Sequence, residues 1–181
     1  MNIDALDLAE QQLLVQVRRV AGLMDEKHEQ LQQSGVFREY GEIYEAYVEL
    51  IESESVGLEA LKRAVFLMWY EQAEPACFSG VFELSAKASR KVLKFLENKI
   101  EAGELDIELK WMLPYYNMIA DWVFSQHADF PNLVAYLSRS DSELWHEVDM
   151  RAEFFAHRGQ MGAYWLSIIL AKEARSGIGA S

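Results

Sequence analysis

The chain has 181 residues, of which 51% are hydrophobic and 25% are charged, a composition typical of a globular protein rather than a disordered one. A chain of this length buries about 70% of its unfolded surface without disulfides or metal ions, and it fits one domain. Its formal net charge of −12 repels phosphate backbones. We therefore expect a soluble single-domain protein that does not bind nucleic acid.

The cysteine content and the apolar runs indicate the compartment. Cys77 is the single cysteine, so no internal disulfide can form, which fits a reducing environment. The N-terminal stretch MNIDALDLAEQQ is acidic and lacks the basic start of a signal peptide. The longest apolar run, residues 163–171 with Ser167 inside it, is too short to span a bilayer. These features predict a cytoplasmic protein with no membrane association.

The N-terminal third is predicted to be helical. Apolar residues place one stripe on a long helix within residues 1–33, which could form an arm, although Gly22 could interrupt it. A second helix follows, in which Tyr40, Tyr44 and Tyr47 lie on the apolar side.

Two predicted helices carry charged faces of opposite sign. One is the acidic side of the second helix, and the other is the basic side of a fourth helix that Ser85 can cap. The two faces could be solvated, could pair with each other within the molecule or across a dimer, or could dock a charged partner. The interaction-face candidates are Glu42, Glu45, Glu49, Lys87, Arg90, Lys91 and Lys94.

A third helix, between the two charged ones, is predicted to run from Leu58 to Glu74. It contains six consecutive apolar residues, 65–70, and we expect it to be an inner helix. Pro75 ends it, because the residue before a proline avoids the α region. Glu71 and Glu74 then lie at a helix C-terminus, where negative charge is unfavourable. Either both carboxylates are exposed or a cationic group meets them, which makes them the first site candidates.

The segment from Glu104 to Ser125 is apolar on nearly every side of a helix, which is typical of a buried helix. We therefore expect the rest of the chain to pack around it. The residues predicted to be almost wholly buried are Trp111, Met112, Tyr116 and Ile119.

Pro114 lies inside this segment and should kink it or divide it into two helices. Asn117 and Asp121 share a face with Pro114, between aromatic residues. They could satisfy the backbone that the proline opens, or they could line a binding pocket. The ligand-pocket candidates are Glu71, Glu74, Tyr115, Asn117, Asp121 and Trp122.

A metal site is considered near the C-terminus. Ser140 and Glu143 have capping-box spacing, which predicts a helix from residue 141 to about Gly159. On that helix a face with two imidazoles and a carboxylate would resemble the ligands of helical-bundle metal sites. The same face lies opposite the apolar side, which argues against the metal. The metal candidates are His146, Glu153 and His157.

These patterns predict an all-α domain over residues 1–175, with seven or eight helices in a bundle-like or orthogonal arrangement and a flexible tail at 176–181. The sequence contains no phosphate-binding glycine loop, nucleophile elbow or zinc-binding cysteine cluster. We therefore expect no cofactor and favour a non-catalytic protein that binds another protein, as an adaptor, an immunity-like inhibitor or a self-associating unit. The alternative is an enzyme or small-ligand-binding protein with an aromatic-lined acidic pocket.

Overall fold

The computed structural model describes residues 2–139 and 150–178, in which every regular element is a helix. The elements are α1 (Ile3–Arg19), α2 (Met24–Gln33), α3 (Val36–Leu50), α4 (Gly57–Ala73), α5 (Ala76–Ser79), α6 (Ala86–Glu101), α7 (Ile107–Ile119), α8 (Trp122–Ser125), α9 (Pro131–Arg139), the 3-10 helix η1 (Ala152–Phe155) and α11 (Gly159–Ile178). The predicted all-α fold is confirmed. No helix within these two ranges has both the length and the apolar composition needed to cross a bilayer.

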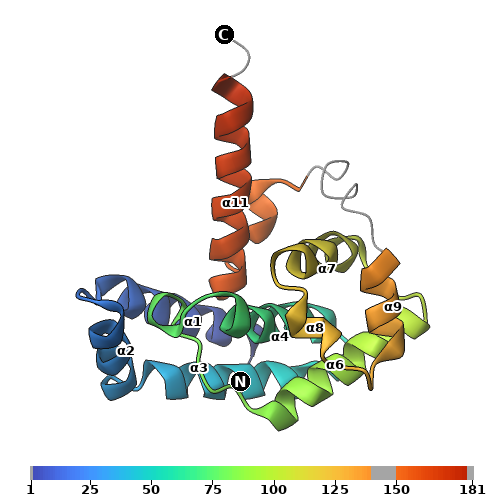
Figure 1. Ribbon diagram of the computed structural model, residues 1–181, viewed down its shortest axis with the longest axis horizontal. Coiled ribbons are helices and arrows are strands. Elements are labelled where there is room, and N and C mark those ends of the chain that lie inside the picture. The colour runs from blue at the N-terminus through green and yellow to red at the C-terminus, as the bar shows by residue number, and fades with distance from the viewer. Residues whose placement is uncertain (1, 140–149, 179–181) are drawn as a thin grey trace.

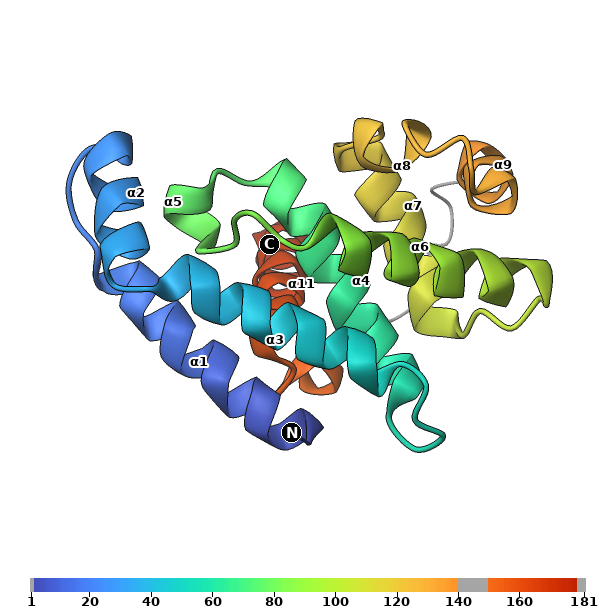
Figure 2. The ribbon, with the colours of Figure 1, turned by 90° about the horizontal axis from the view of Figure 1, so that it is seen from below.

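A layer of helices forms the body, and α11 stands across it (Figure 1). Seen from below, α1 and α3 lie side by side, with α4 next to α3, while α7, α8 and α9 gather beside α6 (Figure 2). The first half of α11 packs on α1, α4 and η1. Its C-terminal half extends beyond the other helices in Figure 1. The helix continues through residue 178, so the tail predicted to begin at 176 is helical for its first three residues.

The innermost helix is α4. Every residue from Ala60 to Trp69 is buried, and α4 contacts α3, α6, α7 and α11. The prediction that this helix is an inner one is confirmed. The buried stretch includes two charged residues, Lys62 and Arg63, whose partners are described below.

Burial along α7 agrees only in part with the prediction. Trp111, Met112 and Tyr116 are almost fully buried, but Ile119 is 45% exposed, so the prediction is wrong for Ile119. The reason is that α7 ends there, because Ala120 adopts a non-helical backbone with φ −149° and ψ 71°. The chain then turns into α8, which buries Val123 and Phe124 instead.

Two helix boundaries differ from the expected ones. Pro114 is accommodated within α7, and the division of the segment comes at Ala120. The long N-terminal helix is two helices, because Val20 is extended and Gly22 has a φ of +124°. The first of these helices packs against α3 and α11 and does not form an arm.

Aromatic side chains join α4, α7 and α11. The indole nitrogen of Trp69 donates a 3.0 Å hydrogen bond to the backbone oxygen of Tyr116, and the indole of Trp165 donates one of 3.0 Å to the Tyr116 hydroxyl. Trp69 and Tyr116 also stack, with ring centroids 4.5 Å apart. These contacts anchor α7 and α11 on the central helix.

Candidate functional site

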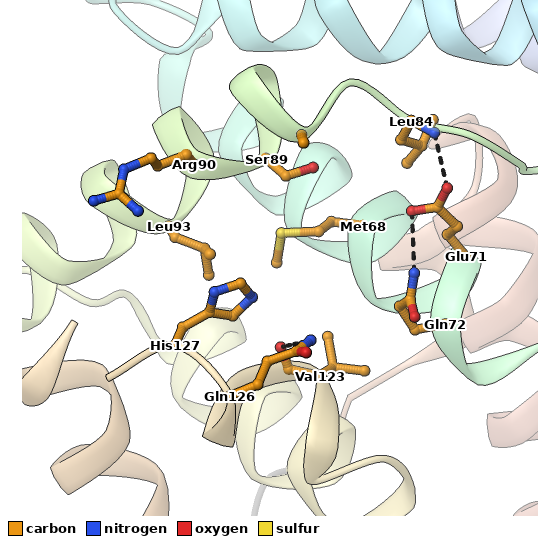
Figure 3. A pocket seen from close by; sticks show the side chains of 11 residues that line it. Met68, Glu71, Gln72, Leu84, Ser89, Arg90, Leu93, Val123, Gln126 and His127 are labelled. Atoms are coloured by element: carbon orange, nitrogen blue, oxygen red, sulfur yellow. Dashed lines mark hydrogen bonds between the residues drawn. The ribbon is translucent and has the colours of Figure 1, made fainter. Parts of the chain in front are cut away.

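A cleft of about 580 Å³ opens where the C-terminal end of α4 meets the first half of α6 and α8 (Figure 3). Its walls come together because α4 ends at Ala73, where Glu74 before Pro75 is extended, and because the side chain of Ser85 caps α6 by accepting from the nitrogen of Ala88. The floor is apolar and the rim is polar. The floor residues include Met68, Leu84, Leu93 and Val123, and the rim residues include Glu71, Gln72, Ser89, Arg90, Gln126 and His127.

Glu71 is the half-buried acid of this cleft. Its Oε1 accepts a 2.8 Å hydrogen bond from the nitrogen of Leu84, while its Oε2 has only a long contact of 3.5 Å with Nε2 of Gln72. Burial raises the pKa of the Glu71 carboxyl, the Leu84 and Gln72 hydrogen bonds lower it, and Glu83 raises it further. Among the ion pairs of the described residues, none includes Glu71.

The basic groups on the rim do not offset that charge. Arg90 is exposed and forms an ion pair of 2.9 Å with Asp129, so its guanidinium already has an anionic partner. The pKa of His127 is lowered by burial and by the nearby Arg90, which favours a neutral imidazole. The charge of Glu71 therefore decides the electrostatic character of the cleft.

A hydroxyl, an imidazole and a carboxylate all reach this cleft, as they do in some catalytic sites. The hydrogen bonds of the described residues connect them differently. Tyr44 donates to Oγ of Ser89 at 3.0 Å, and Glu71 is bonded to Leu84 and Gln72 rather than to His127. What this arrangement offers chemically is a set of acceptor oxygens around an apolar floor.

The other predicted pocket residues do not line this cleft. Glu74 and Asn117 are half-buried, and Asp121 is exposed. The hydroxyls of Tyr115 and Tyr164 are 2.9 Å apart, which ties Tyr115 to α11. Within the described residues, no side-chain hydrogen bond joins Asn117 or Asp121 to the backbone near Pro114. Of the six candidates, the structure brings only Glu71 to the cleft.

Trp122 belongs instead to an exposed apolar surface. Met118, Ile119 and Trp122 are 59%, 45% and 52% exposed, and they lie within five consecutive positions where α7 turns into α8. We call these three residues the α7–α8 patch. The sequence placed Ile119 in the core because it lies on an apolar helical stripe. Periodicity shows that a stripe is apolar, but it does not show whether another element covers that stripe.

The charged faces of α3 and α6 lie next to each other. Glu45 and Glu49 from α3, with Lys87 and Lys91 from α6, line one shallow groove of about 160 Å³. No ion pair within the described ranges crosses it. Of the remaining candidates, Glu42 pairs with Arg38 at 3.7 Å, Arg90 pairs with Asp129, and Lys94 is exposed.

Of the metal candidates, Glu153 and His157 do not share a helical face. His146 lies outside the described residues. Glu153 is in η1, exposed and paired with Arg151 at 3.0 Å, and the exposed His157 has a φ of +59°. Because Ala156 is extended, the expected α-helix does not continue to His157. Within residues 2–139 and 150–178, no group of three or more histidine, cysteine or acidic side chains is placed to hold a metal ion.

A buried ionic network, which sequence reasoning missed, joins α1, α4, α7 and α11. At its centre Arg158 donates to Glu59 from Nε at 2.8 Å and to Glu108 from Nη1 at 2.7 Å. Lys62 pairs with Asp106 at 2.5 Å and also with Glu108. The network residues are Asp7, Glu59, Lys62, Arg63, Asp106, Glu108 and Arg158. A signal in the sequence was the pair Lys62–Arg63 directly before the apolar run of residues 64–70.

Comparisons of this chain with protein-family models, with curated proteins and with solved structures find no match. Its function is therefore inferred from the geometry of its own residues.

Proposed function

We propose that this protein binds a basic protein partner through the α7–α8 patch. The observation that carries the proposal is the exposure of Met118, Ile119 and Trp122 within five consecutive positions of the chain. Clustered large apolar side chains on a surface mark interaction sites. Tryptophan and methionine are also enriched in the centres of protein interfaces, where a few such residues carry most of the binding energy.

The patch rests on a rigid support. The backbone of Tyr116 is bonded to Trp69, Tyr115 is tied to Tyr164, and Glu108 at the start of α7 is held by Arg158. A surface that is already ordered loses little conformational entropy when it binds. The fixed position of α7 therefore supports its use as a docking surface.

Charge supports a basic partner rather than a second copy. Two copies of a chain with a net charge of −12 repel each other, whereas a basic protein is attracted. Asp121 is exposed between Ile119 and Trp122 and offers an acidic contact beside the apolar ones. Adaptors and inhibitors of the immunity type act through such surfaces. A cytoplasmic setting fits the free thiol of Cys77.

The test compares two double variants. Met118→Ser with Trp122→Ser removes the patch, and Leu23→Ser with Met24→Ser changes another exposed apolar pair, 75% and 52% exposed, at the start of α2. The wild type and the α2 variant should recover the same basic protein from extracts of the native cell. The affinity of the purified partner, measured by calorimetry, should fall at least about tenfold for the patch variant only.

Three results would overturn this proposal. One is recovery of no basic protein by the wild type, and another is equal loss of affinity in both variants. The third is patch-dependent dimerisation of the wild type in sedimentation experiments, which would make a second copy the occupant of the patch.

A further inference from the structure

We infer that the cleft between α4, α6 and α8 binds a primary ammonium group on an alkyl chain, with Glu71 as the anionic anchor. None of the three patch residues lines this cleft. The inference therefore goes beyond the proposed function, and either proposal can fail without the other.

The carboxylate of Glu71 is oriented and has free acceptor capacity. The 2.8 Å bond from the Leu84 nitrogen fixes Oε1, whereas Oε2 has only the 3.5 Å contact with Gln72. Figure 3 shows this second oxygen on the side of the carboxylate that faces Met68 and the interior of the cleft. A carboxylate offers about four lone-pair positions, so an N–H donor in the cleft would find an unused acceptor.

The charge of this carboxylate is unmatched within the cleft. The other acid that acts on it, Glu83, has the same sign, and the nearest rim guanidinium, that of Arg90, is paired with Asp129. Charges attract more strongly in a half-buried cleft than on an open surface, because the effective dielectric constant is lower. A cation of the ligand would therefore gain more from Glu71 than from the exposed acids.

The floor indicates what the cation is attached to. Met68, Leu84, Leu93 and Val123 present aliphatic and thioether surface, against which an alkyl chain loses its contact with water. A volume of about 580 Å³ lies in the range of small-ligand pockets, roughly 300–1,000 Å³.

The residues that line the cleft also favour primary over quaternary ammonium ions. Quaternary ammonium groups have no N–H donor and are held by cages of aromatic rings. No Phe, Tyr or Trp is among the residues that line this cleft, whereas Gln72, Ser89 and Gln126 add polar oxygens to the rim. The composition of the cleft thus favours an ammonium group with N–H donors. Such a group occurs in free aliphatic amines and in lysine side chains.

The test is an amide NMR titration of the full chain with n-hexylamine at constant ionic strength. Saturable shifts are expected at the amide of Leu84, because its hydrogen bond ends on Glu71. Hexan-1-ol and heptanoate have the same hexyl chain without the cation and should bind at least about tenfold more weakly. Tetraethylammonium should also bind weakly.

Matched variants locate the ligand. Glu71→Gln keeps an acceptor for the Leu84 nitrogen but removes the charge, and it should weaken hexylamine binding at least about tenfold. Glu74→Gln changes an acid at the same helix end that does not line the cleft, and it should leave the affinity unchanged. Ala86→Trp, at an exposed lining position, should block the cleft while thermal unfolding shows an intact fold.

The inference is overturned if the wild type shows no saturable binding of hexylamine. It is also overturned if Glu71→Gln, or a folded Ala86→Trp, binds the amine as the wild type does. A second pair of probes, spermidine and Nα-acetyl-lysine methylamide, distinguishes the two sources. Tighter binding of the lysine derivative assigns the site to a protein side chain, and tighter binding of spermidine assigns it to a free amine.

Discussion

Glu10 lies at the N-terminus of α11, where its Oε2 accepts a 2.8 Å hydrogen bond from the backbone nitrogen of Gln160. The neighbouring Asp7 accepts one of 2.5 Å from the nitrogen of Gly159. The first backbone nitrogens of a helix have no partner within the helix, and its N-terminus carries positive partial charge. Two acidic side chains from α1 therefore cap the N-terminus of α11 and tie these two helices together.

Glu10 should make stability depend on pH. Burial raises the pKa of Glu10 from 4.5 to about 8, against the opposing effect of the Gln160 hydrogen bond. Its Oε1 and the side-chain oxygen of Gln160 are buried acceptors without a donor in the described residues, which also favours a proton there. The folded state therefore holds a proton that the unfolded state releases near pH 4.5.

The sign follows from that difference. The stabilisation of the folded state by the Glu10 proton is complete below pH 4.5, and it is lost as the pH rises from there towards 8. At about 1.4 kcal/mol per pKa unit, the loss in unfolding free energy is a few kcal/mol. Urea unfolding across this range should show the decline in the wild type and in the exposed Glu52→Gln control. Glu10→Gln should remove it, and a full decline in Glu10→Gln would show that another group holds the proton.

Arg158 should be far more important for stability than an exposed arginine. Arg158→Ala leaves the carboxylates of Glu59 and Glu108 partly buried without their main partner, which costs about 3–5 kcal/mol. Arg90→Ala removes the exposed pair with Asp129 and should cost less than about 1 kcal/mol. Urea denaturation measures both, and equal costs would contradict a structural role for the network.

Glu97 is predicted to hold α9 in place. Its carboxylate is buried and accepts hydrogen bonds from the backbone nitrogens of Asn132 at 3.0 Å and Leu133 at 2.7 Å, at the start of that helix. Glu97→Ala leaves these donors without an acceptor and should cost about 2–3 kcal/mol. The exposed Glu101→Ala, one turn later, is the control. Hydrogen exchange at Leu133 should accelerate only in Glu97→Ala.

Gly159 is expected to be replaceable only at high cost. It has a φ of +56°, and a Cβ at this position would overlap with Oε2 of Glu10. Gly103 has a similar φ of +70° but open space around it. Gly103→Ala should therefore cost only the backbone strain, about 1–2 kcal/mol. Gly159→Ala should lower the melting temperature more than Gly103→Ala does. Similar shifts for both variants would mean that Glu10 moves away from the added Cβ at little cost in free energy.

The class of the fold could be read from the sequence because helices depend on short-range patterns. The tyrosine stripe of α3 repeats within a few residues, and Tyr40, Tyr44 and Tyr47 are fully buried as their spacing indicates. Ser85 caps α6 as predicted, since a cap needs only the neighbouring backbone. The apolar run of α4 likewise identified it as an inner helix.

Which acidic residues face the interior was decided only by the tertiary structure. Glu10, Glu97 and Glu108 resemble the solvated glutamates around them in sequence, but each meets its donors from a segment at least 35 positions away. In the same way, the stripe that ends at Ile119 looks like core material until the path of α8 leaves it uncovered. Periodicity describes one helix at a time, whereas burial and charge pairing depend on which helices meet.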